Sequence, residues 1–93
     1  MTMDTSDDGG FYYFQNSLDK APDADQLRAI QFVYFDADPL NKKIMEYHFP
    51  NLGRTSIPLT KKAIATKLGL TPQEVRRRQR AIGKQIHGAH YGG

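Results

Sequence analysis

The chain has no cysteine, which excludes disulfide bonds, thiolate catalysis and zinc sites built from cysteines. It has no long apolar run, and residues 1–10 are acidic and polar, so the sequence predicts neither a membrane span nor a secretory signal. Strand-type alternation, internal repeats and low-complexity tracts are absent as well. Its 93 residues can form one small domain and leave little room for a deep enzyme cleft. We expect an intracellular, cytoplasmic protein.

The net charge of +3 conceals a strong division of charge along the chain. Residues 1–40 contain eight acidic and two basic side chains, which gives −6, whereas residues 41–93 contain eleven basic and two acidic side chains, which gives +9. Such asymmetry predicts a surface for a polyanion on the second half. Nine of the ten aromatic residues precede residue 50, so base stacking on aromatic rings is not expected in the basic half.

Capping residues and helical spacing predict an all-α fold of four to five short helices that ends in a helix-turn-helix. The expected organisation is a disordered acidic tail (1–10), a single helical domain (11–87) and a flexible C-terminal end (88–93). Within the domain we expect helices over residues 11–19, 23–35 and 38–47, and a connecting loop over 50–58. The FYYF segment that opens the first helix is equally compatible with extended structure.

Residues 60–86 have the pattern of a helix-turn-helix. Thr60 can cap a first helix, and Gly69 supplies the left-handed residue that ends it, so that Leu70 packs back against it. Ala65 is small enough to let the two helices approach each other closely. A large side chain at that position would hold them apart.

The second helix of this pattern carries the basic residues. Thr71 begins it, Pro72 occupies its first turn, and Glu74 completes a Thr-x-x-Glu capping box. An apolar stripe follows helical spacing through Val75, Ile82 and Ile86, while arginines project from other faces. Two helices joined by a tight turn, with the second one basic, form the unit that enters a DNA major groove. The alternative is a helical hairpin whose arginines make a solvated face.

Eight residues are the candidates for contact with DNA: Thr60, Lys61, Thr71, Gln73, Arg76, Arg77, Arg80 and Lys84. Arg76 and Arg77 are the expected base-reading residues, because a guanidinium can donate two hydrogen bonds to guanine. The alternative for both is contact with phosphate alone. Gln73 lies in the first helical turn, where it either reaches an adenine edge or stays solvated.

The segment from Leu40 to Ile86, about half of the chain, resembles region four of bacterial sigma-70-family sigma factors. The likeness runs through IMEYHF (44–49), Leu52 and Gly53, PLT (58–60), IA (64–65), LGLT (68–71), VR (75–76) and RAI (80–82). The resemblance implies a domain that reads a −35-type promoter element in the major groove of double-stranded DNA. It also implies docking on the β-subunit flap of RNA polymerase.

The resemblance also implies residue roles. Three residues would face base edges, namely Gln73, Arg76 and Arg77. Four would lie near the DNA backbone, namely Thr60, Lys61, Arg80 and Lys84. Arg78 departs from the family, which has an apolar residue there, so this helix either packs differently or buries an arginine stem.

Nothing in the chain resembles region two, with which sigma factors bind core polymerase and melt DNA. We therefore expect either a standalone sigma-like regulator, of phage or mobile-element type, or a fragment of a longer protein. The start at Met1 favours the first of these.

The acidic half has more aromatic residues than one small helical core hides easily. Exposed aromatic side chains mark partner surfaces, and four are candidates for contact with a protein partner: Phe32, Phe35, Tyr47 and Phe49. The alternative is that these rings build the core.

Catalytic and metal sites are not predicted. His87 and His90 lie in a glycine-rich end with no third ligand nearby, and His48 is expected at the helix surface or the edge of the core. Asp36 and Asp38 could pair as carboxylates, but Asp38 fits a helix cap better. We expect no enzyme activity, no metal and no cofactor.

Two functions remain open from the sequence. The first is a DNA-binding transcription regulator that also binds RNA polymerase. The second is a protein-interaction module that inhibits RNA polymerase or a sigma factor and keeps the helix-turn-helix as a scaffold.

Overall fold

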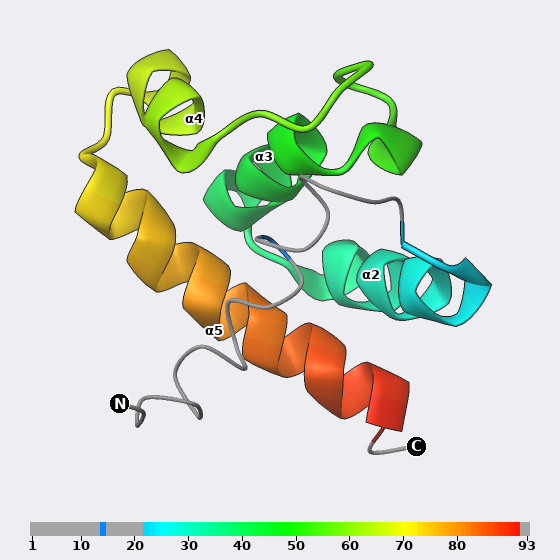
Figure 1. Cartoon of the computed structure of the whole chain (residues 1–93). Helices are drawn as coiled ribbons and strands as arrows, with labels where there is room; N and C mark the ends of the chain where they lie inside the picture. Colours follow the sequence, from blue (N-terminus) through cyan, green and yellow to red (C-terminus); the bar gives the residue numbers. More distant parts are fainter. Residues whose placement is uncertain (1–13, 15–21, 92–93) are drawn as a thin grey trace, which may run out of the picture.

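The computed structural model describes Phe14 and residues 22–91, and every regular element in that part of the chain is a helix (Figure 1). The helices are α2 (Ala24–Asp36), α3 (Pro39–His48), the 3₁₀ helix η1 (Pro50–Leu52), α4 (Lys61–Leu68) and α5 (Pro72–Tyr91). The prediction of an all-α fold is confirmed for these residues. The predicted acidic tail (1–10) and first helix (11–19) lie outside the described residues, apart from Phe14, which is helical and buried.

Aspartates begin the first two helices, as the sequence predicts. The Asp23 side chain accepts a hydrogen bond from the backbone N–H of Gln26 over 2.9 Å, and the Gln26 side chain accepts one from the Asp23 N–H over 3.1 Å. Asp38 accepts a hydrogen bond from the N–H of Asn41 over 2.8 Å, one turn into α3. Each cap satisfies backbone donors that the helix itself leaves without a partner.

One face of α5 forms the centre of the core. Figure 1 shows α5 crossing the molecule, with α4 against its first half and α2 beside its second half, and α3 also contacts it. The buried residues of α5 recur at helical spacing: Val75, Gln79, Ile82, Gly83 and Ile86. The other helices contribute Ala29, Ile30, Val33, Ile44, Met45, Ile64 and Ala65, together with Phe14 and Phe49.

The helix α5 is longer than predicted. We expected it to end near Ile86 and residues 88–93 to be flexible, but it continues to Tyr91 over 20 residues. Ala89 is partly buried against the core, and α2 makes its most extensive contact with α5. Packing against α2 therefore outweighs the low helix propensity of the two glycines at 83 and 88.

The loop before α4 is tied to α3 by polar contacts. Glu46 of α3 accepts hydrogen bonds from the Tyr34 hydroxyl and, over 2.7 Å, from Nε of Arg54. The Tyr34 hydrogen bond and then the Arg54 guanidinium hold the pKa of Glu46 below its usual value. The N–H of Leu59 donates to the Tyr47 carbonyl over 3.1 Å. These contacts fix the position at which α4 begins.

His48 lies inside the core rather than at the surface or the edge of it, where the sequence placed it. Its ring packs against Phe14 and Phe49, with centroids 4.8 and 5.0 Å away, and Nδ1 donates to the Leu59 carbonyl oxygen over 3.1 Å. Burial lowers the pKa of His48 from 6.5 to about 4, because the apolar surroundings disfavour the charged imidazolium.

Stability should therefore fall as the pH drops from 7.5 to 5. In that range the unfolded chain binds a proton at His48 with a pKa of 6.5, whereas the folded chain does not bind one until the pH approaches about 4. The free energy of unfolding should decrease by about 2 kcal/mol over this range, measured by urea denaturation at several pH values.

The variant His48→Gln should be less stable at pH 7.5 but should lose most of this pH dependence. His87→Gln, a change of the same type at an exposed position of α5, is the matched control and should keep it. Parallel pH profiles for His48→Gln and the unchanged chain would show that His48 does not titrate in this way.

Candidate nucleic-acid interface

A three-residue turn joins α4 and α5. The side chain of Thr60 accepts a hydrogen bond from the N–H of Ala63 over 3.2 Å and so caps α4. Gly69 follows the last residue of α4 with φ 71°, in the left-handed region. The N–H of Leu70 then donates to the Ala65 carbonyl over 2.9 Å. Leu70 also packs against the core. The predicted roles of Thr60 as a cap, of Gly69 as the left-handed residue and of Leu70 as a packing residue are therefore confirmed.

The start of α5 is capped by Thr71. Its hydroxyl oxygen accepts a hydrogen bond from the N–H of Glu74 over 3.1 Å, which is one half of the predicted capping box. The Glu74 carboxylate, which the box would direct back to Thr71, binds Arg77 and Arg78 instead. The predicted starting point of the helix is correct, but the reciprocal side-chain contact is not formed.

Small and β-branched side chains bring α4 and α5 together. Ala65 and Ile64 of α4 and Val75 of α5 are all buried in the core. Because a packed interior does not expand to admit extra atoms, a larger side chain at Ala65 is expected to hold the two helices apart. The turn and this contact together fix the direction of α5 relative to α4.

Five of the predicted DNA-contact residues lie on one face of α5: Gln73, Arg76, Arg77, Arg80 and Lys84. Residues of an α-helix are about 100° apart, so this spacing places them within roughly 100° of the helix circumference, bordering the buried stripe. Gln73, Arg77 and Lys84 are exposed, and Arg76 and Arg80 are half-buried at the margin of the core. We call these five residues the basic face.

The start of α4 adds two more candidates, and the start of α5 adds a third. Thr60 is exposed and Lys61 is half-buried, and Thr71 is exposed at the start of α5. Residues 60–84 contain eight basic side chains and one acidic side chain, so this part of the chain carries +7. All eight predicted side chains are exposed or half-buried.

The Glu74 carboxylate binds two arginines, a contact that was not predicted from the sequence. Arg77 donates to it through Nε over 3.2 Å and through Nη2 over 2.6 Å, and Arg78 donates through Nε over 2.9 Å. The hydrogen bonds from Arg77 and then Arg78 lower the pKa of Glu74, so the carboxylate is charged at neutral pH. The three- and four-residue spacings were the signal that could have revealed this cluster.

Arg78 does not belong to the basic face. Its Nη1 donates to the side-chain oxygen of Asn41 over 3.0 Å and lies 3.9 Å from a carboxylate oxygen of Asp38, both at the start of α3. About a quarter of its side chain is exposed, so the stem lies along the protein. Of the two alternatives for this position, the structure agrees with a buried arginine stem, which here links α5 to α3.

The four predicted protein-partner residues do not lie on one surface. Phe32 and Phe35 of α2 are 65% and 79% exposed. Tyr47 of α3 is half-buried, and the charged groups of Arg54 and Lys67 lie 5.4 and 5.9 Å from its ring centroid. The prediction for Phe49 is wrong, because its side chain is fully buried.

Phe49 packs against Phe14 and His48, with ring centroids 5.0 Å from each. Its place directly after α3 turns the ring into the core, where a partner cannot reach it.

Comparison with protein-family models, with curated proteins and with solved structures finds no match for this chain. Among the described residues, no helix has the length and apolar character needed to cross a membrane. The same part of the chain gathers no group of three or more side chains suited to holding a metal ion.

In the turn between α4 and α5, position 69 should tolerate only residues that readily adopt the left-handed backbone conformation. A Cβ at Gly69 would meet no atom within 4 Å, so the cost of a side chain there comes from the backbone alone. Gly69→Val should lower the free energy of unfolding by about 1–2 kcal/mol, and Gly69→Asn by less, because asparagine visits this conformation more readily. Thermal and urea unfolding measure both.

Gly88→Ala is the matched control. Gly88 lies within α5, has no positive φ and has open space around a new Cβ, so alanine should stabilise the helix by about 0.5–1 kcal/mol. Equal stabilities for Gly69→Val and the unchanged chain would contradict the turn geometry.

Proposed function

We propose that this protein is a DNA-binding transcription regulator whose α4 and α5 form a helix-turn-helix, with α5 as the recognition helix. The observation that carries the proposal is the basic face. Five polar and basic side chains share one surface of α5, next to the face that anchors this helix in the core. The regulator would act in the cytoplasm and would carry out no catalysis.

Local geometry supports the helix-turn-helix assignment. The first helix of such a unit crosses the DNA backbone while the second lies in the major groove. Here the turn at Gly69 and the small Ala65 hold the two helices in close contact. Thr60 at the start of α4 and Thr71 and Gln73 at the start of α5 are exposed, as simultaneous contact with backbone and bases requires.

In this proposal Arg76 and Arg77 read bases. The other predicted DNA-contact residues mainly position the helix on the DNA. An arginine can donate two hydrogen bonds to the O6 and N7 atoms of guanine, and Gln73 can pair with adenine in the same way. Lys61, Arg80 and Lys84 supply charge for the phosphates, which favours binding without specifying sequence.

Glu74 bears directly on this mechanism. The guanidinium of Arg77 is paired with Glu74 in the free protein, and this pair is exposed enough to exchange for a DNA contact. In the free protein, the ion pair with Glu74 holds the Arg77 side chain near the first turn of α5. This turn is the part of a recognition helix that lies closest to the base edges.

The sequence resemblance to sigma factor region four extends the proposal to promoters. It favours a −35-type element as the DNA site and the flap of the RNA polymerase β subunit as a protein partner. Because the chain has nothing like region two, such a regulator would rely on polymerase or on another sigma factor to melt DNA.

A second candidate function follows from the exposed phenylalanines. Phe32 and Phe35 project from α2, in the part of the chain whose net charge is acidic, and this surface suits a protein better than a nucleic acid. An inhibitor of polymerase or of a sigma factor would use that surface and would leave the basic face unused. DNA binding by the isolated protein separates the two functions.

The Arg76→Ala/Arg77→Ala double variant should lose sequence preference, because each base-reading arginine contributes about 1–3 kcal/mol of discrimination. Selection from a random duplex library, followed by gel shifts on selected and scrambled duplexes, measures this. Lys61→Ala should instead weaken all duplexes alike. If about five phosphates are neutralised, log K should fall with log salt with a slope near −4 to −5.

Arg28→Ala is the control for charge alone, since Arg28 lies exposed on α2, and it should leave DNA binding nearly unchanged. A double variant at Arg76 and Arg77 that binds and discriminates duplexes as the unchanged chain does would refute the assignment of α5 as the recognition helix.

A further inference from the structure

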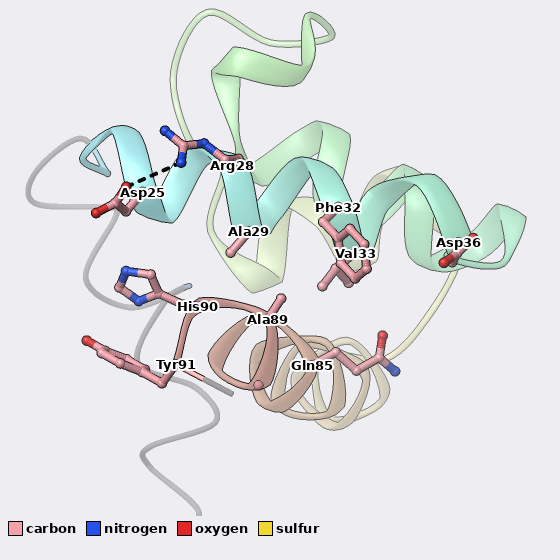
Figure 2. Close-up of a pocket in the computed structure, with 11 residues that line it drawn as sticks. Asp25, Arg28, Ala29, Phe32, Val33, Asp36, Gln85, Ala89, His90 and Tyr91 are labelled. Atoms are coloured by element: carbon pink, nitrogen blue, oxygen red, sulfur yellow. Dashed lines mark ion pairs between the residues drawn. The ribbon is translucent and has the colours of Figure 1, made fainter. Parts of the chain in front are cut away.

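A groove of about 1050 Å³ lies between α2 and the last turns of α5. Figure 2 shows Ala29 and Val33 of α2 directed toward Ala89 of α5, with Asp25 and Asp36 near opposite ends of the α2 wall. Small residues keep the groove open, because longer side chains at Ala29, Gly88 or Ala89 would fill it. Nothing in the sequence pattern revealed this feature, since its two walls are some 60 residues apart in the chain.

Large exposed rings border the groove. Phe32 on α2 is 65% exposed and Tyr91 on α5 is 67% exposed, and both belong to its lining. An apolar hollow flanked by exposed aromatic side chains is the usual form of an anchor site at a protein interface. Both walls are helices, and a third helix packs well along such a pair by fitting its ridges into the groove between them.

The charge around the groove is acidic. Two aspartates, Asp25 and Asp36, and one arginine, Arg28, line the groove. Arg28 is paired with Asp25 at 3.7 Å, so the lining carries a net charge of −1. On the other wall, residues 85–91 contain no lysine, arginine, aspartate or glutamate. This net negative charge favours a partner with positive charge over a polyanion.

We propose that this groove docks a cationic amphipathic helix of a protein partner. Leucine-sized side chains would enter the hollow over Ala29 and Ala89, while lysines or arginines near the two ends would face Asp25 and Asp36. These aspartates are eleven positions apart on α2, a rise of about 16 Å, so three turns of the partner helix span the groove. This docking does not depend on DNA binding by α5.

Two other occupants fit less well. Residues 1–10 of this chain contain three aspartates and no basic residue, so they have the same sign as the rim. In a second copy, the basic face of α5 would match the charge, but it has no large apolar side chain to fill the hollow. Pairing of two such grooves would bring aspartate to aspartate.

The test uses the full chain and a fluorescent 14-residue helical peptide that has leucines on one face and lysines on the other. A matched peptide replaces every lysine with glutamate. Fluorescence anisotropy should show binding of the lysine peptide, weakening as salt rises, and at least about tenfold weaker binding of the glutamate peptide.

Gly88→Leu should abolish this binding. Gly88 lines the groove, and a Cβ there meets no atom within 4 Å. A leucine at this position is therefore expected to occupy the groove, and it also favours the helix. Ala81→Leu, at an exposed position of α5 outside the groove, is the matched control and should bind as the unchanged chain does. Circular dichroism verifies that each variant is folded.

The charge-reversed variant Asp25→Lys/Asp36→Lys provides a second, independent test. It should bind the glutamate peptide in preference to the lysine peptide. Equal binding of both peptides, binding by Gly88→Leu at full strength, or no binding of the lysine peptide would overturn the proposal. So would sedimentation showing a dimer of the unchanged chain that Gly88→Leu dissociates, since the groove would then hold a second copy.

Discussion

Three helices pack against a single face of α5, and the rest of the described structure depends on this contact. The face is apolar at Val75, Ile82 and Ile86 and is buried beneath α2, α3 and α4. Burial of such side chains contributes about 1.5–3 kcal/mol each, so α5 cannot rotate about its axis without losing much of the stability of the domain. Whatever lies next to this face is therefore presented in a fixed orientation.

This constraint links the core to the candidate interface. The proposed base-reading arginines have long side chains, but the backbone that carries them is held by the core, by the cap at Thr71 and by the turn at Gly69. Arg78 strengthens the arrangement, because it joins α5 to Asn41 at the start of α3. A preorganised scaffold of this kind lowers the entropic cost of placing several polar groups on one ligand.

The two ends of α5 differ both in the helix that they contact and in the charge around them. Its first half, with α4, belongs to the segment that carries +7, while its last turns lie beside α2, whose segment has an excess of aspartate. This division would attract a polyanion to one end of α5 more than to the other, and under the proposed function it would restrict how the domain lies on DNA. The acidic end remains available for a protein.

Several helix boundaries could be predicted from the sequence, because they depend only on residues that are close together in the chain. The caps at Asp23, Asp38 and Thr60 and the left-handed glycine at 69 act within one or two turns, so a reader of the sequence can find them. The apolar spacing likewise predicted which face of α5 is buried.

Features that depend on distant segments were missed or misplaced. Phe49 and His48 are core residues because Phe14 packs against both, and no local pattern reveals that contact. The continuation of α5 to Tyr91 and the groove beside it both depend on α2, far away in the chain. The Glu74 cluster is the exception, since its spacing was visible and was read only as a capping box.

The most direct test of the account is a titration of the isotope-labelled protein with a duplex selected from a random library, followed by amide chemical shifts in NMR spectra. We predict that changes concentrate at residues 60–62 and on the exposed side of residues 71–84, with α2 and residues 85–91 nearly unaffected. Changes centred on α2 and residues 85–91, or no changes at the first half of α5, would contradict the central claim that α4 and α5 form one DNA-facing surface.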